Sequence, residues 1–408
     1  MLNALWIGFF LVAFAAALVQ ALAGNIGIFA TVMQAAFEAA KTAFEVALGL
    51  TGVMCLWLGV MRIGERAGFL DALGRWLAPL FSRLFPEVPR GHPALGSITM
   101  NMAANILGLD NAATPMGLKA MRELQDLNPS PDTASNAQIL FLVINASSVT
   151  LLPVTIFTYR AQLGAHDPSD VFIPILMATY CSTLAGFLFV STLQRLRLDR
   201  VVLAWVAGIS AVVGGLAVWF ARLPAAEMTA QSSALSNFLL LALLVTFLLG
   251  AARKRINAYE AFIDGAKEGF QTAVSIIPYL VAMLVAIAML RASGALPAFV
   301  DGVRGGVAAM GFGTAWVDAL PTMLMKPLSG SGARAMMVET MHAHGADSFA
   351  GRLASIVQGS TETTFYVLAV YFGSVGIKRV RYAVAGGLVA DLAGFVAAVG
   401  AAYLFFGR

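Results

Sequence analysis

The feature that most constrains this chain is a series of apolar runs that are each long enough to cross a lipid bilayer. The first run, LNALWIGFFLVAFAAALVQALA, covers Leu2–Ala23. About 20 apolar residues in a helix cross a hydrocarbon core of about 30 Å. The run lacks the basic start and the small-residue cleavage site of a secretory signal peptide, so we predict a retained first helix.

Eight further runs have the same character, which predicts nine crossings in total. Charged residues make up only 12% of the chain and the mean hydropathy is +0.80, whereas charged residues are about a quarter of a soluble protein. The fold class that we predict is therefore an all-α polytopic membrane protein. The eight runs are Phe44–Met61, Asn136–Tyr159, Val171–Leu193, Val201–Ala221, Leu235–Ala252, Gln271–Leu290, Leu353–Phe372 and Tyr382–Phe406.

Two segments contain too much Gly, Pro, Asn and Ser to be ordinary spans. They are His92–Leu127 and Asp318–Met341. We predict that each is a re-entrant pair of short helices. Such broken helices occur at membrane depth only where protein or water satisfies the freed backbone groups.

The distribution of Lys and Arg predicts the orientation in the membrane. Arg195–Arg200, Ala252–Arg255 and Lys378–Arg381 are strongly basic, whereas Gly164–Asp170 has neither residue type. Basic loops face the cytoplasm in most membrane proteins. We therefore predict a multi-pass protein of a bacterial inner membrane with a cytoplasmic N-terminus. The net charge of +4 is explained in this way, and it predicts no nucleic-acid partner.

Similar segments in the same order, among them AGFLDAL around Gly68 and SGALPAF around Gly294, indicate an internal repeat. AKTAF at Ala40–Phe44 matches AKEGF at Ala266–Phe270, and NASSVT at Asn145–Thr150 aligns with QGSTET at Gln358–Thr363. A single helix between the copies would place the second copy upside down, which is the arrangement of inverted repeats in secondary transporters. We predict a first repeat at residues 1–195, a linking transmembrane helix at 196–234 and a second repeat at 235–408.

The stretch QGSTETT places a carboxylate in a predicted span. An ionised carboxylate at the centre of a membrane costs about 2.5–3.5 kcal/mol on insertion scales, so Glu362 is our candidate for proton or cation coupling. Seven small or polar residues cover every face of a helix, so the helix is either unwound there or surrounded by protein and water. The neutral candidates for solute binding here are Gln358, Ser360, Thr361 and Thr363, joined in the first copy by Asn145, Ser147 and Ser148.

The two broken segments supply further candidate ligands. In the first copy a helix is predicted to start around Thr114 and Pro115, because proline suits the first helical turn. Helix starts have free N–H groups that bind anions. A plainer interpretation is that Asn, Ser and Gly cap broken helices without any ligand. The candidate binding residues are Asn101, Asn105, Asp110, Asn111 and Thr114 in the first copy and Lys326, Ser329, Ser331 and Arg334 in the second.

Catalytic and metal chemistry find little support in the residues. SGSG at Ser329–Gly332 lacks the first glycine of a nucleophile elbow, and no phosphate-loop or dinucleotide motif is present. The two cysteines, Cys55 and Cys181, lie in apolar runs, and the four histidines are scattered. We predict no enzyme activity, no cofactor and no metal site.

At the broken segments the sequence resembles a known family. NMAANILGLDNAATPMGLKAMREL at Asn101–Leu124 resembles spore maturation protein A, and KPLSGSGARAMMVE and QGSTETTFYVLAVYFGSVGIKR resemble spore maturation protein B. The resemblance covers nearly the whole chain and suggests a fusion of the pair. It implies the nucleoside-recognition, or gate, group, which includes membrane parts of nucleoside and ferrous-iron transporters, and therefore two gate repeats. No GTPase domain accompanies them in this chain.

Two functions remain open at this stage. The first is a secondary transporter or facilitator of a small polar solute, which could be anionic or nucleoside-like, bound near the membrane midplane between the repeats. The second is a non-transporting membrane scaffold for an envelope or spore-maturation complex. The expected partners are the solute and the lipid bilayer. Small-residue faces such as Ala383–Ala402 could also pack against a second copy of the chain.

Overall fold

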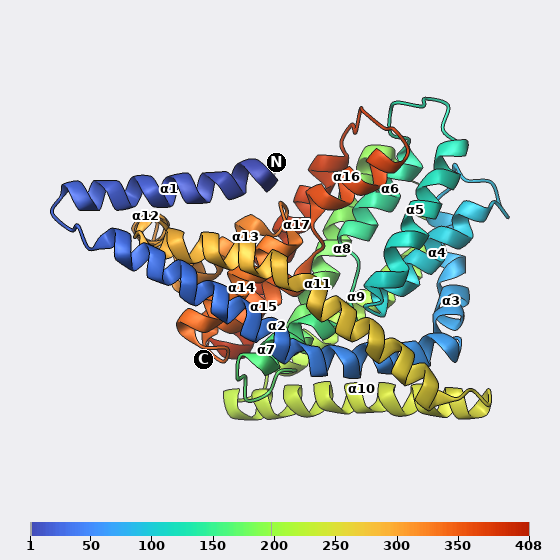
Figure 1. Cartoon of the computed structure of the whole chain (residues 1–408). Helices are drawn as coiled ribbons and strands as arrows, with labels where there is room; N and C mark the ends of the chain where they lie inside the picture. Colours follow the sequence, from blue (N-terminus) through green and yellow to red (C-terminus); the bar gives the residue numbers. More distant parts are fainter. Residues whose placement is uncertain (1, 197, 408) are drawn as a thin grey trace. The chain divides into compact units, whose positions relative to one another are not determined.

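The computed structural model describes residues 2–196 and 198–407, without the side chains of Leu2 and of residues 110–112, 225, 226 and 229. The described residues form α-helices, a short 3-10 helix and no strand (Figure 1). Seven of these helices are long and apolar enough to cross a membrane, which confirms an all-α polytopic membrane protein. They are α1 (Leu2–Leu22), α2 (Ile28–Arg66), α8 (Phe172–Gln194), α9 (Arg200–Ala221), α10 (Ala225–Arg253), α11 (Ala258–Ala292) and α17 (Ala383–Phe406).

Two of the nine predicted spans are wrong, because each is broken into two short helices. The first span is replaced by α6 (Asn136–Ala146) and α7 (Val154–Gln162), and the second by α15 (Phe349–Ser360) and α16 (Thr364–Ser374). Helices of 9 to 12 residues rise about 14–18 Å, roughly half of a hydrocarbon core. Of the two alternatives for QGSTETT, the unwound helix is therefore the one found.

The two segments that were predicted as pairs of short helices are broken as expected. In the first, α4 (Pro93–Ile106) is followed by α5 (Asp110–Asp126). The predicted helix start at Thr114 and Pro115 is wrong, because α5 begins at Asp110 and Pro115 lies inside it. In the second, η1 (Ala315–Ala319) and α13 (Leu320–Met325) precede α14 (Gly330–His344).

The order of elements repeats along the chain. The series from α2 to α8, with α3 (Phe69–Leu84), has a counterpart from α11 to α17, with α12 (Ala295–Ala309). In each series a long helix is followed by a helix of about one half-span, two broken helix pairs and a full-length last helix. The helix α9 lies between the two series in the sequence. The helix α1 precedes the first series, and α10 precedes the second. Whether the second series is inverted in the membrane stays a prediction.

Equivalent glycines turn the chain at the same point of both series. Gly68 precedes α3 with φ of 80°, and Gly294 precedes α12 with φ of 77°. An L-residue in this left-handed conformation is strained by roughly 1–2 kcal/mol. The two positions therefore favour glycine for the same backbone reason, at the offset that the sequence repeat shows.

Side chains close the starts of several helices. Ser135 and Gln138 form a reciprocal capping box at the start of α6. Asp199 accepts a hydrogen bond of 2.9 Å from the backbone N–H of Val202 at the start of α9. Such caps satisfy N–H groups that lack a partner within the helix.

The chain divides into two compact units that do not follow the two series. One contains Met1–Leu58, Thr155–Pro168 and Ala266–Gln358, and the other contains the rest. The first unit thus joins α7 to α12–α15, and the second joins α16 to α3–α6. Each unit is therefore built from both halves of the chain. The chain passes from one unit to the other at or near the polar breaks between α6 and α7 and between α15 and α16.

Candidate functional site

The helix breaks of the second unit satisfy one another's backbone groups. The N–H of Glu362, between α15 and α16, donates to the carbonyl oxygen of Ala146 at 2.8 Å. The N–H of Leu151, between α6 and α7, donates to the carbonyl oxygen of Ile106 at 2.8 Å. Buried backbone groups released by a break need such partners. The backbone groups at these breaks therefore have hydrogen-bond partners, so the breaks are stable parts of the fold.

Two buried asparagines form the centre of the polar cluster in this unit. The amide of Asn145, on α6, donates to the side-chain oxygen of Asn101, on α4, at 2.6 Å. The amide of Asn101 donates to the carbonyl oxygen of Ala113 at 2.7 Å. Asn101 is 0% exposed and Asn145 is 3% exposed. The cluster therefore ties both broken segments of the first half of the chain together.

An aromatic residue from the second half of the chain completes this cluster. The hydroxyl of Tyr371, on α16, is hydrogen-bonded to the side chains of Asn101 and Asn145. Its ring stacks on Phe141 with centroids 6.0 Å apart. A Cβ on Gly117 would overlap the Tyr371 hydroxyl and lie 2.9 Å from the Asn101 amide nitrogen. Glycine at this position therefore lets α5 approach the cluster.

Sequence reasoning missed Tyr371, although a signal was present. Tyr371 follows Thr364 by seven residues on the same helix, and residues about two turns apart share a helix face. Because Tyr371 lies on the same helix face as the polar break, its hydroxyl could have been chosen as a candidate binding group. Its contact with the asparagines could not be inferred, because they belong to the other half of the chain.

A second polar group of the same unit surrounds Asp391, on α17. The carboxylate accepts a hydrogen bond of 2.7 Å from the hydroxyl of Thr364, the first residue of α16. Ser182, on α8, donates to the carbonyl oxygen of Ala390 at 2.9 Å. The sequence analysis did not select Asp391 either, although it is the single acidic residue of a 24-residue apolar helix.

The first unit carries the predicted cationic residues. Ser329 caps α14, and its hydroxyl accepts from the N–H of Gly332 at 3.1 Å and lies 3.2 Å from the Ser331 hydroxyl. Capping, the plainer interpretation, is thus what Ser329 does in this structure. Lys326 is 4% exposed, and Arg334 is half-buried.

Polar groups of this unit include hydroxyls without a hydrogen-bond partner among the described residues. The hydroxyl of Thr322 is one turn before Lys326, and that of Tyr159 interacts electrostatically with Arg334. Arg334 has no ion-pair partner in the described part of the chain. Unpartnered buried polar groups are uncommon in native proteins. The hydroxyls of Thr322 and Tyr159 and the guanidinium of Arg334 are therefore groups that could still bind a polar ligand.

A buried ion pair joins the two halves of the chain in the first unit. Arg160, at the end of α7, is 0% exposed and lies 3.1 Å from the carboxylate of Asp347, just before α15. Arg160 also donates to the carbonyl oxygen of Ala346 at 2.8 Å. The second oxygen of Asp347 accepts from the N–H of His166 at 2.8 Å. The pair was not predicted, because its partners are far apart in sequence.

The remaining predicted residues occupy varied environments. Asn105 is half-buried, and its amide lies 3.5 Å from the Asn101 side-chain oxygen. Glu362 is exposed, and Thr114 is half-buried. The side chains of Asp110 and Asn111 lie outside the described residues. The buried ones are Ser147, whose hydroxyl bonds back to Val143, and Ser148, Gln358, Ser360, Thr361 and Thr363.

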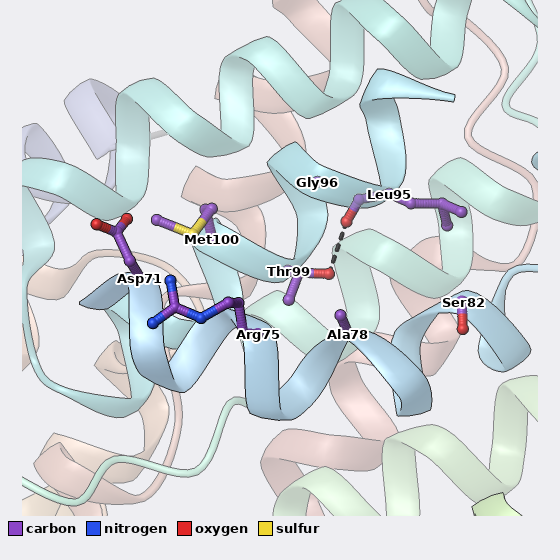
Figure 2. A pocket seen from close by; sticks show the side chains of 8 residues that line it. All are labelled: Asp71, Arg75, Ala78, Ser82, Leu95, Gly96, Thr99 and Met100. Atoms are coloured by element: carbon purple, nitrogen blue, oxygen red, sulfur yellow. Dashed lines mark hydrogen bonds between the residues drawn. The ribbon is translucent and has the colours of Figure 1, made fainter. Parts of the chain in front are cut away.

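A separate pocket of about 340 Å³ lies between α3 and α4. Figure 2 shows Asp71 and Arg75 on one side and the Thr99 hydroxyl bonded to the Leu95 carbonyl on the other. None of the predicted binding residues lines it. We therefore place the candidate site at the helix breaks and not in this pocket. No group of three or more His, Cys, Asp or Glu that could hold a metal occurs among the described residues.

The helix breaks fall within two matches to one family model. The family is described as "Gate: Nucleoside recognition", and its model matches residues 47–162 and 273–378, which together exceed half of the chain. This protein belongs to the Gate family. Each match runs from a long helix of one series to the end of the polar breaks in that series.

Two curated relatives of this Gate-family protein come from Bacillus subtilis (strain 168). Spore maturation protein A is 37% identical over 188 residues, covering 46% of this chain and 93% of the relative. Spore maturation protein B is 45% identical over 175 residues, covering 42% of this chain and 97% of the relative. The predicted resemblance to both proteins is confirmed. A comparison with solved structures finds no match.

Proposed function

We propose that this Gate-family protein is a secondary transporter or facilitator of a small polar solute, and not an enzyme. The observation that carries the proposal is the pair of polar helix breaks in each half of the chain. In secondary transporters, such broken helices near the membrane midplane bind substrate and coupling ions. The amide and hydroxyl groups at the breaks suit a polar solute, and the family description, nucleoside recognition, agrees with a solute of this kind.

The charges of the first unit favour an anionic group on the solute. Arg334 has no ion-pair partner among the described residues, and Lys326 is nearly buried close to the start of α14. A free guanidinium and a helix start both attract carboxylate or phosphate oxygens. The uncharged cluster of Asn101, Asn145 and Tyr371 belongs to the second unit and would by itself suit a neutral solute with hydroxyl or amide groups.

Flux measurements in proteoliposomes test this proposal. Nucleosides, dicarboxylates, amino acids and metal ions are offered to purified wild type, to Arg334→Ala and to Glu362→Gln. We expect saturable flux of one solute class, with the KM for an anionic solute raised about tenfold or more in Arg334→Ala, since a charged hydrogen bond contributes about 1.5–3 kcal/mol. Arg304→Ala, whose guanidinium pairs with Asp318 at 2.6 Å, is the control for loss of a positive charge.

The flux screen also separates transport from the scaffold hypothesis. Absence of flux for every solute, under a proton gradient and under a sodium gradient, with folded protein, would refute transport and direct work to partner proteins. Glu362, exposed at the break between α15 and α16, remains the predicted coupling residue. Unchanged pH dependence in Glu362→Gln would remove that role.

The location in a bacterial inner membrane, with a cytoplasmic N-terminus, belongs to the same proposal. It rests on the basic loops at Arg195–Arg200, Ala252–Arg255 and Lys378–Arg381, which should face the cytoplasm. A cysteine introduced at His166, in the loop without Lys or Arg, should react in intact cells with a reagent that cannot cross the membrane. Labelling only after the cells are broken would contradict this orientation.

A further inference from the structure

The pocket between α3 and α4 has charged groups at one end and apolar groups along the rest of its walls. Its wall on α3 is a row at three- or four-residue spacing, which is one face of a helix: Asp71, Arg75, Ala78 and Ser82. Its wall on α4 consists of Leu95, Gly96, Thr99 and Met100. Figure 2 shows the two charged residues at one end of the row and Ser82 at the other. The hydroxyls of Ser82 and Thr99 donate to carbonyl oxygens of their own helices.

Arg75 is the group in this pocket that can bind an anion. Its side chain is exposed and has no hydrogen bond or ion pair with another described residue. Two other arginines of this region differ, because Arg66 pairs with Asp264 at 2.6 Å and Arg83 pairs with Asp199 at 2.8 Å. A guanidinium binds phosphate oxygens through parallel N–H groups, so Arg75 is suited to a phosphate.

The acid of the pocket does not cancel this positive charge. Asp71 forms no ion pair with Arg75 in the described structure, although the two lie one turn apart. A Cβ on Gly68 would lie 2.3 Å from the ammonium nitrogen of Lys254 and 3.8 Å from a carboxylate oxygen of Asp71. The ammonium group is therefore near this acid, and the charged end of the pocket has a net positive charge.

Both ends of α3 lie at the same surface of the membrane. Arg83, near the end of α3, pairs with Asp199, the N-cap of α9, and Gly68, just before α3, is beside Lys254, the C-cap of α10. Both α9 and α10 are long and apolar enough to cross a membrane. A short connection joins the end of α9 to the start of α10, so the start of α9 and the end of α10 face one side. The helix α3 therefore lies along that surface.

A pair of tryptophans indicates that the pocket is at the depth of the lipid headgroups. Trp76, beside Arg75, is 60% exposed, and its ring contacts that of Trp205 with centroids 4.2 Å apart. Trp205 is on α9, about 8 Å along the helix from its start. Exposed tryptophan is enriched at the membrane–water interface, with its ring at headgroup level. Arg75 is thus within reach of lipid phosphates.

We propose that the pocket between α3 and α4 binds an anionic phospholipid of the surrounding membrane. Arg75 binds the phosphate, and Ala78, Leu95 and Gly96 contact the first carbon atoms of the acyl chains. The net positive charge favours a lipid whose headgroup is negative, and basic pockets at a membrane surface bind such headgroups. This site is separate from the helix breaks, and the proposal does not depend on the transport function.

Native mass spectrometry of the delipidated full chain in detergent tests the charge recognition. Phosphatidylglycerol and phosphatidylcholine with identical acyl chains are titrated, and the lipid-bound fraction gives an apparent Kd. We expect the wild type to bind phosphatidylglycerol more tightly. Its Kd should rise about tenfold in Arg75→Gln, because a charge-assisted hydrogen bond to the phosphate is lost. Arg90→Gln, which removes an exposed arginine outside the pocket, is the matched control and should bind like wild type. Equal Kd values for the two lipids, or equal effects of the two variants, would overturn the proposal.

A second variant tests the apolar wall. Gly96→Leu places a side chain in the pocket without a clash, since a Cβ there would meet no atom within 4 Å. Leucine is also a better helix former than glycine, so the protein should remain folded. We expect weaker binding of phosphatidylglycerol, whereas Gly208→Leu, on α9 and with equally open space, should bind like wild type. Unchanged binding in Gly96→Leu would refute this pocket as the lipid site.

A soluble headgroup distinguishes a lipid site from a site for phosphate alone. Glycerol phosphate carries the phosphate without an acyl chain. A large excess should leave bound phosphatidylglycerol in place, because the acyl contacts are absent from the competitor. Displacement of the lipid would show that the pocket recognises phosphate only, and would overturn the assignment to a phospholipid.

Discussion

Replacing Asp347 by alanine is expected to lower the free energy of unfolding by about 3 kcal/mol, because removing one partner of a buried ion pair is strongly destabilising. Arg160 remains 0% exposed beside the missing carboxylate. Asp347 also accepts from the N–H of His166, so a loop loses its anchor too. The apparent melting temperature of the detergent-purified protein measures the effect. We expect a loss at the lower end of the range for buried ion pairs, because 36% of the Asp347 side chain is exposed to solvent.

Two control variants make this prediction specific. Asp301→Ala removes a carboxylate that is 71% exposed and 3.6 Å from Arg304, so its effect should stay within about 0.5 kcal/mol. The double variant Arg160→Met/Asp347→Ala removes both charges and should be more stable than Asp347→Ala alone. Equal stability of Asp347→Ala and wild type would show that the pair does not hold α7 in its unit.

Replacing Asn101 by alanine is expected to have the second largest effect on stability. The change removes the acceptor of the Asn145 amide and the donor to the Ala113 carbonyl. Each buried polar group left without a partner costs about 1–3 kcal/mol, so we expect a loss of about 3 kcal/mol, measured by thermal unfolding. Under the proposed transport function, solute flux should fall as well, because α4 and α5 lose their hydrogen-bonded link to α6 through Asn101.

Asn105→Ala is the matched control for this change. Its amide lies 3.5 Å from the same oxygen of Asn101 and its side chain is half-buried, so a loss of about 0.5–1 kcal/mol is expected. If Asn101→Ala were no more destabilising than Asn105→Ala, the asparagine cluster would not be a structural centre of the second unit.

Several features of the fold could be predicted because they depend on local chemistry. Apolar runs of about 20 residues predicted α1, α8, α9 and α17 with nearly the observed bounds. Gly, Pro, Asn and Ser in the two broken segments predicted pairs of short helices there. The match of Gly68 with Gly294 reflects one left-handed turn used twice.

Other features could not be predicted for physical reasons. Asn136–Tyr159 is apolar enough to resemble a continuous span, yet α6 ends at Ala146. The released backbone groups near this break are satisfied through hydrogen bonds to distant residues, such as that from Glu362 to the Ala146 carbonyl. Hydropathy measures the cost of transferring side chains and contains no information on such partners. The wrong start predicted for α5 has another cause, because it rested on the preference of proline for the first helical turn, and Pro115 lies inside the helix instead.

The sequence by itself determined that this protein is helical, crosses a membrane and repeats a Gate-type pattern, since apolar length and local backbone preferences act within a few turns. The tertiary structure alone decided which half of the chain completes which unit. It placed Tyr371 on Asn101 and Asn145, Asp347 on Arg160, and Thr364 on Asp391. These groups meet because a buried polar side chain must find a partner wherever the folded chain provides one.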